Sequence, residues 1–218
     1  MASSAVDSGR AAGSGHVRRP RSRAKYDRRR REVVNTAARL FAERGYHNTS
    51  IDDLVEATGL QRGGLYHYIE GKQHLLLLTH EELIAPLLVR AEAIAAADLP
   101  AEAKLRELLR AWVAHVAGHR DHMVVFGEER RLIESDPAWH EVRAARERFQ
   151  SLLEEVLREG DRKGRFVIED IGIVQMSILG IVNHMPQWLD PEGRLAPEQV
   201  ADRCLDVLLR GLLPRGRG

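Results

Sequence analysis

The stretch GLQRGGLYHYIEGK, from Gly59 to Lys72, decides the fold, because it combines helical apolar spacing with a weak helix start. Two consecutive glycines, Gly63 and Gly64, stand near the beginning of the predicted helix, and each lowers helix propensity by about 1 kcal/mol relative to alanine. Three polar rings follow immediately, at Tyr66, His67 and Tyr68. Because glycine has no Cβ, this pattern indicates a helix whose backbone approaches another molecule closely.

The residues before this stretch predict two more helices. From about Asp27 to Gly45 the apolar residues repeat at helical spacing. Ser50 is a good N-cap for a second helix, and the two aspartates that follow favour the positive end of a helix dipole. Gly59 suits the positive φ of a helix stop, so the third helix spans about 61–69. Three such helices with a tight turn describe a helix-turn-helix, whose last helix enters the DNA major groove.

DNA binding gives the glycines and the rings one explanation. A helix without Cβ atoms at its start comes close to phosphates and base edges, and its N-terminus directs free N–H groups at phosphate. The tyrosine hydroxyls and the histidine ring face the DNA, and Lys72 adds a charge one turn later. A helical hairpin with surface aromatics is the alternative, and the basic N-terminal segment argues against it.

Charge is unevenly distributed along the 218 residues, although the net charge is only +1. Residues 1–31 hold ten Arg and Lys against two aspartates, or +8, and the remainder holds 23 basic against 30 acidic residues, or −7. This asymmetry indicates an N-terminal end that meets a polyanion. Residues 1–25 lack apolar periodicity and are predicted to form a disordered basic arm, with a solvated tail as the alternative.

Beyond the helix-turn-helix the apolar spacing predicts longer helices, at about 72–97 with a kink near Pro86, 101–117, 120–134, 137–162, 170–188 and 197–212. Strand-like alternation and internal repeats are missing from the sequence. We therefore expect an all-α fold. Its parts are an arm over 1–25, an N-terminal three-helix helix-turn-helix domain over 26–71, a helical ligand-binding and dimerisation bundle over 72–213, and a tail over 214–218.

The composition limits the function classes. The single cysteine, Cys204, excludes an intrachain disulfide and favours a reducing compartment. Because no apolar run reaches the roughly 18–20 residues of a membrane span, and the N-terminus lacks a secretory signal, we expect a cytoplasmic protein with no membrane partner. The sequence shows no paired core carboxylates, nucleophile elbow or phosphate loop, which argues against an enzyme. An architectural DNA-binding protein without a ligand remains the rival to a ligand-responsive regulator.

The segment AARLFAERGYHNTSIDDLVEATGLQRGGLYHYIEGKQHLL resembles the N-terminal domain of TetR-type, or tetracycline-repressor-like, transcriptional regulators, over about residues 28–76. The resemblance implies an all-α homodimer that binds an approximately palindromic double-stranded DNA operator. It also implies a small-molecule effector in the C-terminal domain, with neither a catalytic site nor a cofactor. It assigns DNA contacts to Thr49, Ser50, Arg62, Gly63, Tyr66, His67, Tyr68 and Lys72.

Three positions depart from that family pattern. Gln61 replaces the usual Ser or Thr cap of the third helix. Gly64, on the same DNA-binding surface, replaces a common Thr or Ser and removes one phosphate contact. Ile69 replaces the usual Phe in the core. None of these breaks the motif, but because of Gly64 no operator sequence is predicted from the family pattern.

The last two predicted helices favour a dimer. Helix 170–188 is apolar nearly all round and is predicted to be buried. The last helix carries one apolar stripe, at Val200, Cys204, Val207, Leu208 and Gly211. Two such helices per subunit, paired across a two-fold axis, form a four-helix interface. A monomeric helical core is the alternative.

Aromatic and polar residues of the body predict an effector cavity, lined by Trp112, Met123, Phe126, Phe149, Gln175, Met176, Leu179, Asn183 and Trp188. Aromatic residues at this spacing are equally ordinary core. His115, His119 and His122 have spacing that permits a metal site. Because Gly118 and its polar neighbours fit a helix end better, no metal is expected.

HMVVFGEERRLIESDPAW and NHMPQWLDPEGRLAPEQVAD are similar to TetR-type regulators of lipid and aromatic-acid catabolism that respond to acyl-CoA thioesters. The resemblance implies a repressor of such genes that an acyl-CoA thioester releases. Arginines for its phosphates would be Arg130, Arg131, Arg143 or Arg146, which are equally suited to surface ion pairs. The alternative is a regulator of a drug-efflux transporter that responds to apolar or cationic small molecules.

Overall fold

The computed structural model describes residues 20–212. Its α-helices are α1 (Pro20–Arg44), α2 (Ile51–Thr58), α3 (Arg62–Tyr66), α4 (Lys72–Ala96), α5 (Ala101–Gly118), α6 (Arg120–Glu128), α7 (Arg130–Ser135), α8 (His140–Arg162), α9 (Ile171–His184) and α10 (Pro197–Leu212). Two 3₁₀ turns, η1 (Pro137–Trp139) and η2 (Met185–Gln187), interrupt them. Because residues 20–212 contain no strand, the all-α prediction is confirmed.

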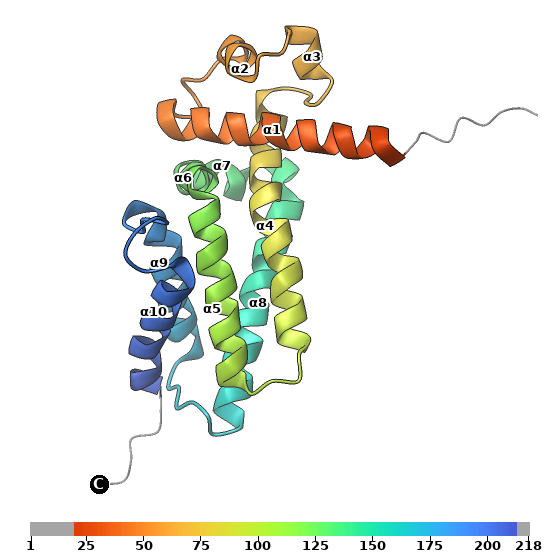
Figure 1. Cartoon of the computed structure of the whole chain (residues 1–218). Helices are drawn as coiled ribbons and strands as arrows, with labels where there is room; N and C mark the ends of the chain where they lie inside the picture. The colour runs from red at the N-terminus through yellow and green to blue at the C-terminus, as the bar shows by residue number, and fades with distance from the viewer. Residues whose placement is uncertain (1–19, 213–218) are drawn as a thin grey trace, which may run out of the picture.

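The helices form a small layer on a larger bundle. In Figure 1, α1 lies across the end of the bundle, with α2 and α3 on its outer side. α4 leaves this layer and runs down the bundle beside α5 and α8, and α9 and α10 lie along the other side of α5. None of the helices in the described range has the length and apolar character that a membrane crossing requires.

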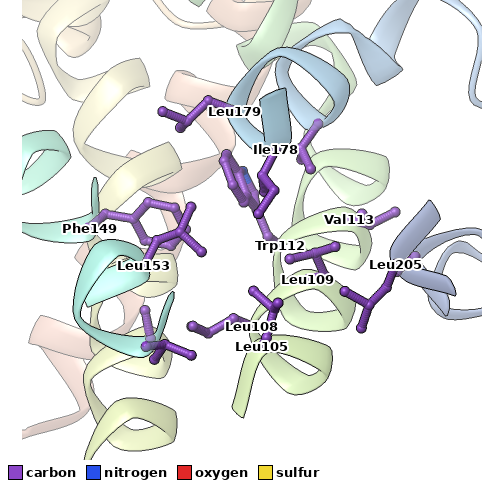
Figure 2. Packing of buried hydrophobic residues seen from close by; sticks show 14 of the residues in the cluster. Leu105, Leu108, Leu109, Trp112, Val113, Phe149, Leu153, Ile178, Leu179 and Leu205 are labelled. Carbon is purple, nitrogen blue, oxygen red and sulfur yellow. The ribbon is translucent and has the colours of Figure 1, made fainter. Parts of the chain in front are cut away.

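The bundle is held together by a core in which α5 is central. Figure 2 shows Phe149 and Leu153 of α8 directed at Trp112 of α5, with Leu205 of α10 on the opposite side of that helix. The Trp112 and Phe149 rings meet edge to face, with centroids 4.8 Å apart. Such aromatic pairs add about 0.5–1.5 kcal/mol beyond the area that they bury. This packing fixes the wall of the cavity described below.

A second core joins the small layer to the bundle. Val34 and Phe41 of α1 are fully buried there with Leu54 of α2 and Leu65 of α3. The same cluster contains Val125 of α6 together with residues from α7, η1 and α8. Because α1 packs along α6 as well as α4, the two layers share buried surface at two helices.

Several predicted boundaries are wrong. α1 begins at Pro20, so residues 20–25 are helical and not part of a disordered arm. These residues are mainly Arg, Lys and Ala, which favour helix, and proline is tolerated in the first turn. The first 19 residues of the predicted arm and the predicted tail at 214–218 lie outside the described residues.

In the body, α4 continues as one helix through Pro86 as predicted, and the differences concern two later helices. The helix predicted at 120–134 is divided at Glu129 into α6 and α7. α9 ends at His184 and passes into the 3₁₀ turn η2, because Pro186 has no N–H with which to continue the α-helical hydrogen bonds. α9 is also not buried in the single chain, since Ile173 and Met176 are each 66% exposed.

Candidate DNA-binding surface and effector cavity

The α2–α3 unit is built by local capping. Ser50 caps α2, its hydroxyl accepting from the Asp53 N–H at 3.1 Å while the Asp53 carboxylate accepts from the Ser50 N–H at 2.7 Å. Gly59 ends α2 with φ of +65°, a conformation that side chains with a Cβ rarely adopt. Gln61 precedes α3 without a side-chain cap. These caps fix the turn that presents α3 to solvent.

α3 exposes one face and buries the other. Leu65 and Ile69 are buried against the small layer, whereas Arg62, His67 and Tyr66 (46% exposed) face outward. Arg62 lies 3.5 Å from the Asp52 carboxylate in an exposed ion pair, which contributes little to stability. The outward side chains are therefore free to meet another molecule.

Packing within the protein does not require glycine at either position of the pair in α3, because both positions have room for a side chain. A Cβ added at Gly63 meets no atom within 4 Å, and one added at Gly64 meets only Leu60, at an ordinary 3.8 Å. Neither glycine adopts a positive φ. Because the fold itself does not require glycine at these two positions, the predicted close approach of DNA is the reason left for them.

Tyr26 is a component of this surface that sequence reasoning missed. Its ring packs against Tyr68 with centroids 5.1 Å apart and meets His67 edge to face at 5.5 Å. Its hydroxyl donates to the His67 carbonyl at 3.3 Å. Tyr68 is consequently half-buried, and the start of α1 is fastened to the end of α3. An isolated aromatic in a run of arginines was the available signal.

The basic start of α1 lies next to the end of α3. Lys25, Arg28 and Arg29 line a polar hollow together with His67 and Tyr68. Arg29 is partly committed elsewhere, since it pairs with Glu32 at 2.7 Å, while Lys25 and Arg28 are exposed. The positive charge counted in the sequence therefore reaches the face that α3 presents.

Two predicted phosphate contacts need correction. The Thr49 side chain is 1% exposed and donates to the Gly45 carbonyl at 2.9 Å, so its hydroxyl does not face the surface. Lys72 is half-buried, and its ammonium donates to the Tyr46 and Thr49 carbonyls at 3.0 and 2.9 Å while lying 4.4 Å above the Tyr46 ring. These two bonds join α4 to the loop before α2, a link that only tertiary packing reveals, and a third ammonium donor remains for the predicted phosphate contact.

The bundle contains a partly open cavity of about 60 Å³ between α4, α5, α6, α8 and α9. Six of the nine predicted residues line it: Trp112, Met123, Phe126, Phe149, Leu179 and Asn183. Besides the predicted Asn183, the polar lining comes from Arg146, which the sequence offered for phosphate binding, and from His80, His115 and Gln150, which it did not assign to an effector. These residues are separated widely in the sequence, so spacing along any one helix did not indicate them.

Three predicted lining residues lie elsewhere. Met176 points away from the bundle, and Trp188 is 52% exposed beyond the end of α9. Gln175 donates to the Gln150 carbonyl at 2.6 Å and so braces α9 against α8 behind the cavity wall. The sequence placed all three on the inner side of α9 because that helix is apolar around most of its circumference.

Of the four arginines considered for phosphate binding, only Arg146 lines the cavity. Its guanidinium carbon lies 4.6 Å from the Phe126 ring centroid. Burial, followed by the charge of Arg130, lowers the pKa of Arg146. Arg143 instead donates to the Ile133 and Asp136 carbonyls at 2.8 and 2.7 Å, and Arg130 pairs with Glu134 at 2.7 Å.

Histidines gather at the α4–α6 end of the cavity. The rings of His115 and His119 stack with centroids 4.1 Å apart, and His119 meets His122 at 5.5 Å. Burial lowers the pKa of His80, of His115 and of His122 to about 4 each. No cluster of side chains suited to a metal ion occurs within the described range. The stacked rings direct their nitrogens at backbone carbonyls rather than at a common centre.

A helix-turn-helix with an exposed third helix, carried on a helical bundle with a cavity, is the arrangement of a DNA-binding regulator of transcription. Comparison with protein families agrees with this class. Residues 33–78 match the model of bacterial regulatory proteins of the tetR family, and residues 98–212 match the tetracyclin repressor-like C-terminal domain. The chain belongs to the TetR family of transcriptional regulators.

Individual relatives extend along nearly the whole chain. The HTH-type transcriptional repressor KstR2 of Mycobacterium tuberculosis is 25% identical over 189 residues, which cover 86% of this chain and 94% of the repressor. The crystal structure of PfmR from Thermus thermophilus has a TM-score of 0.74 at 29% identity and covers 85% of this chain and 97% of that one. AibR, solved in complex with isovaleryl coenzyme A and operator DNA, has a TM-score of 0.72 at 25% identity, covering 83% and 98%.

Proposed function

We propose that this protein is a homodimeric, ligand-responsive repressor that reads an operator with α3 and releases it when an acyl-CoA thioester enters the bundle cavity. In this assignment residues 26–71 form the DNA-binding domain and residues 72–213 form the effector and dimerisation domain. The single observation that carries the choice of effector is the charge of the cavity wall. Arg146 lines the cavity, and no acidic side chain does so among the residues that the structure describes.

That charge distinguishes the two effector classes that the sequence left open. A cationic drug entering this cavity would meet a guanidinium without a compensating carboxylate, which opposes binding. An acyl group with an oxygen acceptor meets a donor instead. The complex of AibR with isovaleryl coenzyme A provides a solved example of a similar chain with such a ligand. The apolar remainder of the wall suits the hydrocarbon part of the effector.

The outer faces of α9 and α10 support the dimer. Ile173 and Met176 on α9 and Val207 on α10 are 66%, 66% and 72% exposed in the single chain. Gly172, Ser177 and Gly180 are exposed on the same helix, and such small side chains let a facing helix approach closely. A two-fold pair through these faces gives each operator half-site one reading helix, with centres about 34–36 Å apart or a modest multiple of that distance.

The size of the cavity explains how an effector would act. A volume of about 60 Å³ is well below the roughly 150 Å³ of an engineered cavity that binds benzene, so a long acyl chain would have to displace parts of the surrounding wall. Two of those helices lead directly to the DNA-binding layer. α4 begins immediately after the α3 turn, and α6 lines the cavity with Met123 and Phe126 while packing against α1 on its other side.

Effector entry would therefore favour a dimer with altered α3 spacing, because α4 and α6 move with the cavity wall. A differential affinity of about 3 kcal/mol between the two forms gives roughly a hundredfold loss of operator binding. By thermodynamic reciprocity, operator DNA must then weaken effector binding by the same factor.

Calorimetric titration of the full-length dimer with acyl-CoAs, free acids and cationic drugs, with and without operator DNA, tests the proposal. We expect long-chain or cyclic acyl-CoAs to bind, and operator DNA to weaken that binding. Binding of cationic drugs alone would overturn the thioester assignment in favour of regulation of drug efflux. If no compound changes operator affinity, the protein is a DNA-binding protein without an effector.

A further inference from the structure

The cavity wall contains a buried hydrogen-bond acceptor that has no partner. The side chain of His80 is 2% exposed and lines the cavity. Its Nδ1 lies 2.8 Å from the Leu76 carbonyl oxygen, and because a carbonyl only accepts, Nδ1 carries the proton. Nε2 is therefore the acceptor of the neutral ring, and it is buried without a hydrogen-bond partner among the described residues. Burying such a group unpaired costs about 1–3 kcal/mol.

The same cavity contains a donor that is equally uncommitted. Arg146 is half-buried, and within the described part of the chain its guanidinium forms neither an ion pair nor a hydrogen bond. Glu134 on the neighbouring helix pairs with Arg130 instead. Arg148, two residues along α8, differs from Arg146 in pairing with Glu155 at 2.9 Å on the outer surface. The contact of Arg146 with a ring therefore leaves its N–H donors available to a ligand.

His80 and Arg146 both line the cavity beside Phe126, and in addition to burial the charge of Arg146 is near enough to His80 to lower its pKa. The His80 and Phe126 ring centroids are 5.9 Å apart, and the Arg146 guanidinium lies 4.6 Å from the Phe126 centroid. A single polar end of a ligand would thus meet an acceptor and a cation together. A hydrocarbon satisfies neither group, and a carbonyl or carboxylate oxygen alone satisfies only Arg146.

We propose that the cavity selects a hydroxylated acyl ligand, in which the acyl oxygen accepts from Arg146 and a hydroxyl on a nearby carbon donates to His80 Nε2. This inference rests on the proposed function and adds the chemistry of the effector's polar end. It also distinguishes oxidation states of the same acyl group. A ketone in place of the hydroxyl presents a second acceptor to Nε2, and two acceptors repel each other.

The decisive experiment uses acyl-CoAs with matched carbon skeletons on the full-length dimer. The series contains decanoyl-CoA, its 2-hydroxy, 3-hydroxy and 3-oxo derivatives, and the same set on a cyclohexyl-bearing acyl chain. We expect one hydroxy isomer to bind roughly five- to tenfold more tightly than the unsubstituted parent, as one added buried hydrogen bond predicts. The 3-oxo compound should bind no more tightly than the parent.

Three variants locate the effect. His80→Phe keeps a ring of similar size beside Trp139 and should remove the preference for the hydroxyl without weakening the unsubstituted parent. Arg146→Met should weaken every acyl-CoA in the series. Arg148→Met removes the same charge from the same helix at an external position and should change none of the affinities.

The outcomes separate the two proposals. If hydroxylated and unsubstituted acyl-CoAs bind equally, or if Arg148→Met weakens binding as much as Arg146→Met, the hydroxylated-ligand inference is wrong while the repressor assignment stands. If no acyl-CoA of either skeleton binds, the thioester assignment fails together with the inference. The ligand series on the wild-type protein decides the question even if His80→Phe does not fold.

Discussion

The Lys72 ammonium lies 2.9 Å from the carbonyl oxygen of Thr49, which fastens the first turn of α4 to the loop that precedes α2. A second bond, to the Tyr46 carbonyl at 3.0 Å, closes the same connection. The residue expected to clamp a DNA phosphate is thus first a structural link between the bundle and the reading unit. We therefore expect a movement at the start of α4 to act on the loop before α2.

We therefore predict that Lys72→Met lowers the free energy of unfolding by about 1–3 kcal/mol, because two carbonyls lose a partially buried charged donor. Operator affinity should fall as well, since the reading unit loses its orientation. Urea denaturation and gel-shift titration measure the two effects. Arg62→Met is the matched control. Loss of its exposed cation should reduce operator affinity and leave the free energy of unfolding nearly unchanged. Unchanged stability in Lys72→Met would contradict the structural role.

Gly63→Ala and Gly64→Ala should separate stability from DNA binding. The structure has room for a Cβ at both positions, and alanine favours helix by about 1 kcal/mol over glycine. Thermal denaturation should show equal or higher stability, while gel shifts show weaker operator binding because a methyl group separates the backbone from the DNA. Gly160→Ala is the contrast, since its Cβ would collide with the buried Phe166 ring and destabilise the fold. Unaltered operator affinity in both α3 variants would refute the close approach.

Charges placed on the outer faces of α9 and α10 should dissociate the dimer. Met176→Glu and Val207→Glu would each place a pair of carboxylates near the two-fold axis, where burial without a partner is costly. Light scattering after size-exclusion chromatography should report a monomer of about half the mass of the wild type. Val89→Glu, which changes an equally exposed residue on α4, should remain dimeric. A wild-type monomer at micromolar concentration would rule out the interface itself.

Acid should destabilise the protein through its buried histidines. Burial lowers the pKa of His80 and of His122 to about 4, and the charges of Arg146 and neighbouring histidines act in the same direction. As the pH falls, these histidines therefore bind protons in the unfolded chain before they do so in the folded one. Their contribution to the free energy of unfolding is fully present above about pH 6.5 and is lost as the pH falls toward 4. At about 1.4 kcal/mol per pKa unit, His80 alone accounts for at most about 3 kcal/mol.

One carboxyl opposes this trend. Burial raises the pKa of Glu82 to about 7, although the charges of Arg30 and Arg31 act in the opposite direction. The contribution of Glu82 to the free energy of unfolding is therefore fully present below about pH 4.5 and is lost as the pH rises toward 7. Urea denaturation at about pH 7 and about pH 5 should show a net loss of stability on acidification. Glu82→Gln should enlarge that loss, and His80→Phe should reduce it. The opposite order would show that other groups control the acid response.

The sequence by itself determined the helices and the DNA-binding motif, because the forces that form them are local. The capping box of Ser50 with Asp53, the αL stop at Gly59 and the period of apolar residues all act within one or two helical turns. At the start of α1 the absence of apolar periodicity outweighed the helix propensity of Arg, Lys and Ala, and the prediction was wrong. Tyr26 fastens this helix to rings more than forty residues away, and such a contact is decided by tertiary packing.

Only the tertiary structure decided which faces of those helices meet. Met176 and Leu179 lie three residues apart on one nearly uniform apolar helix, yet one is exposed and the other lines the cavity. The rotation of α9 is set by its packing against α8 and α5, not by its own composition. For the same reason His80 of α4 and Arg146 of α8 both meet Phe126 of α6. The two groups form a common ligand-binding site only after folding, because contacts between distant residues depend on how complete helices pack.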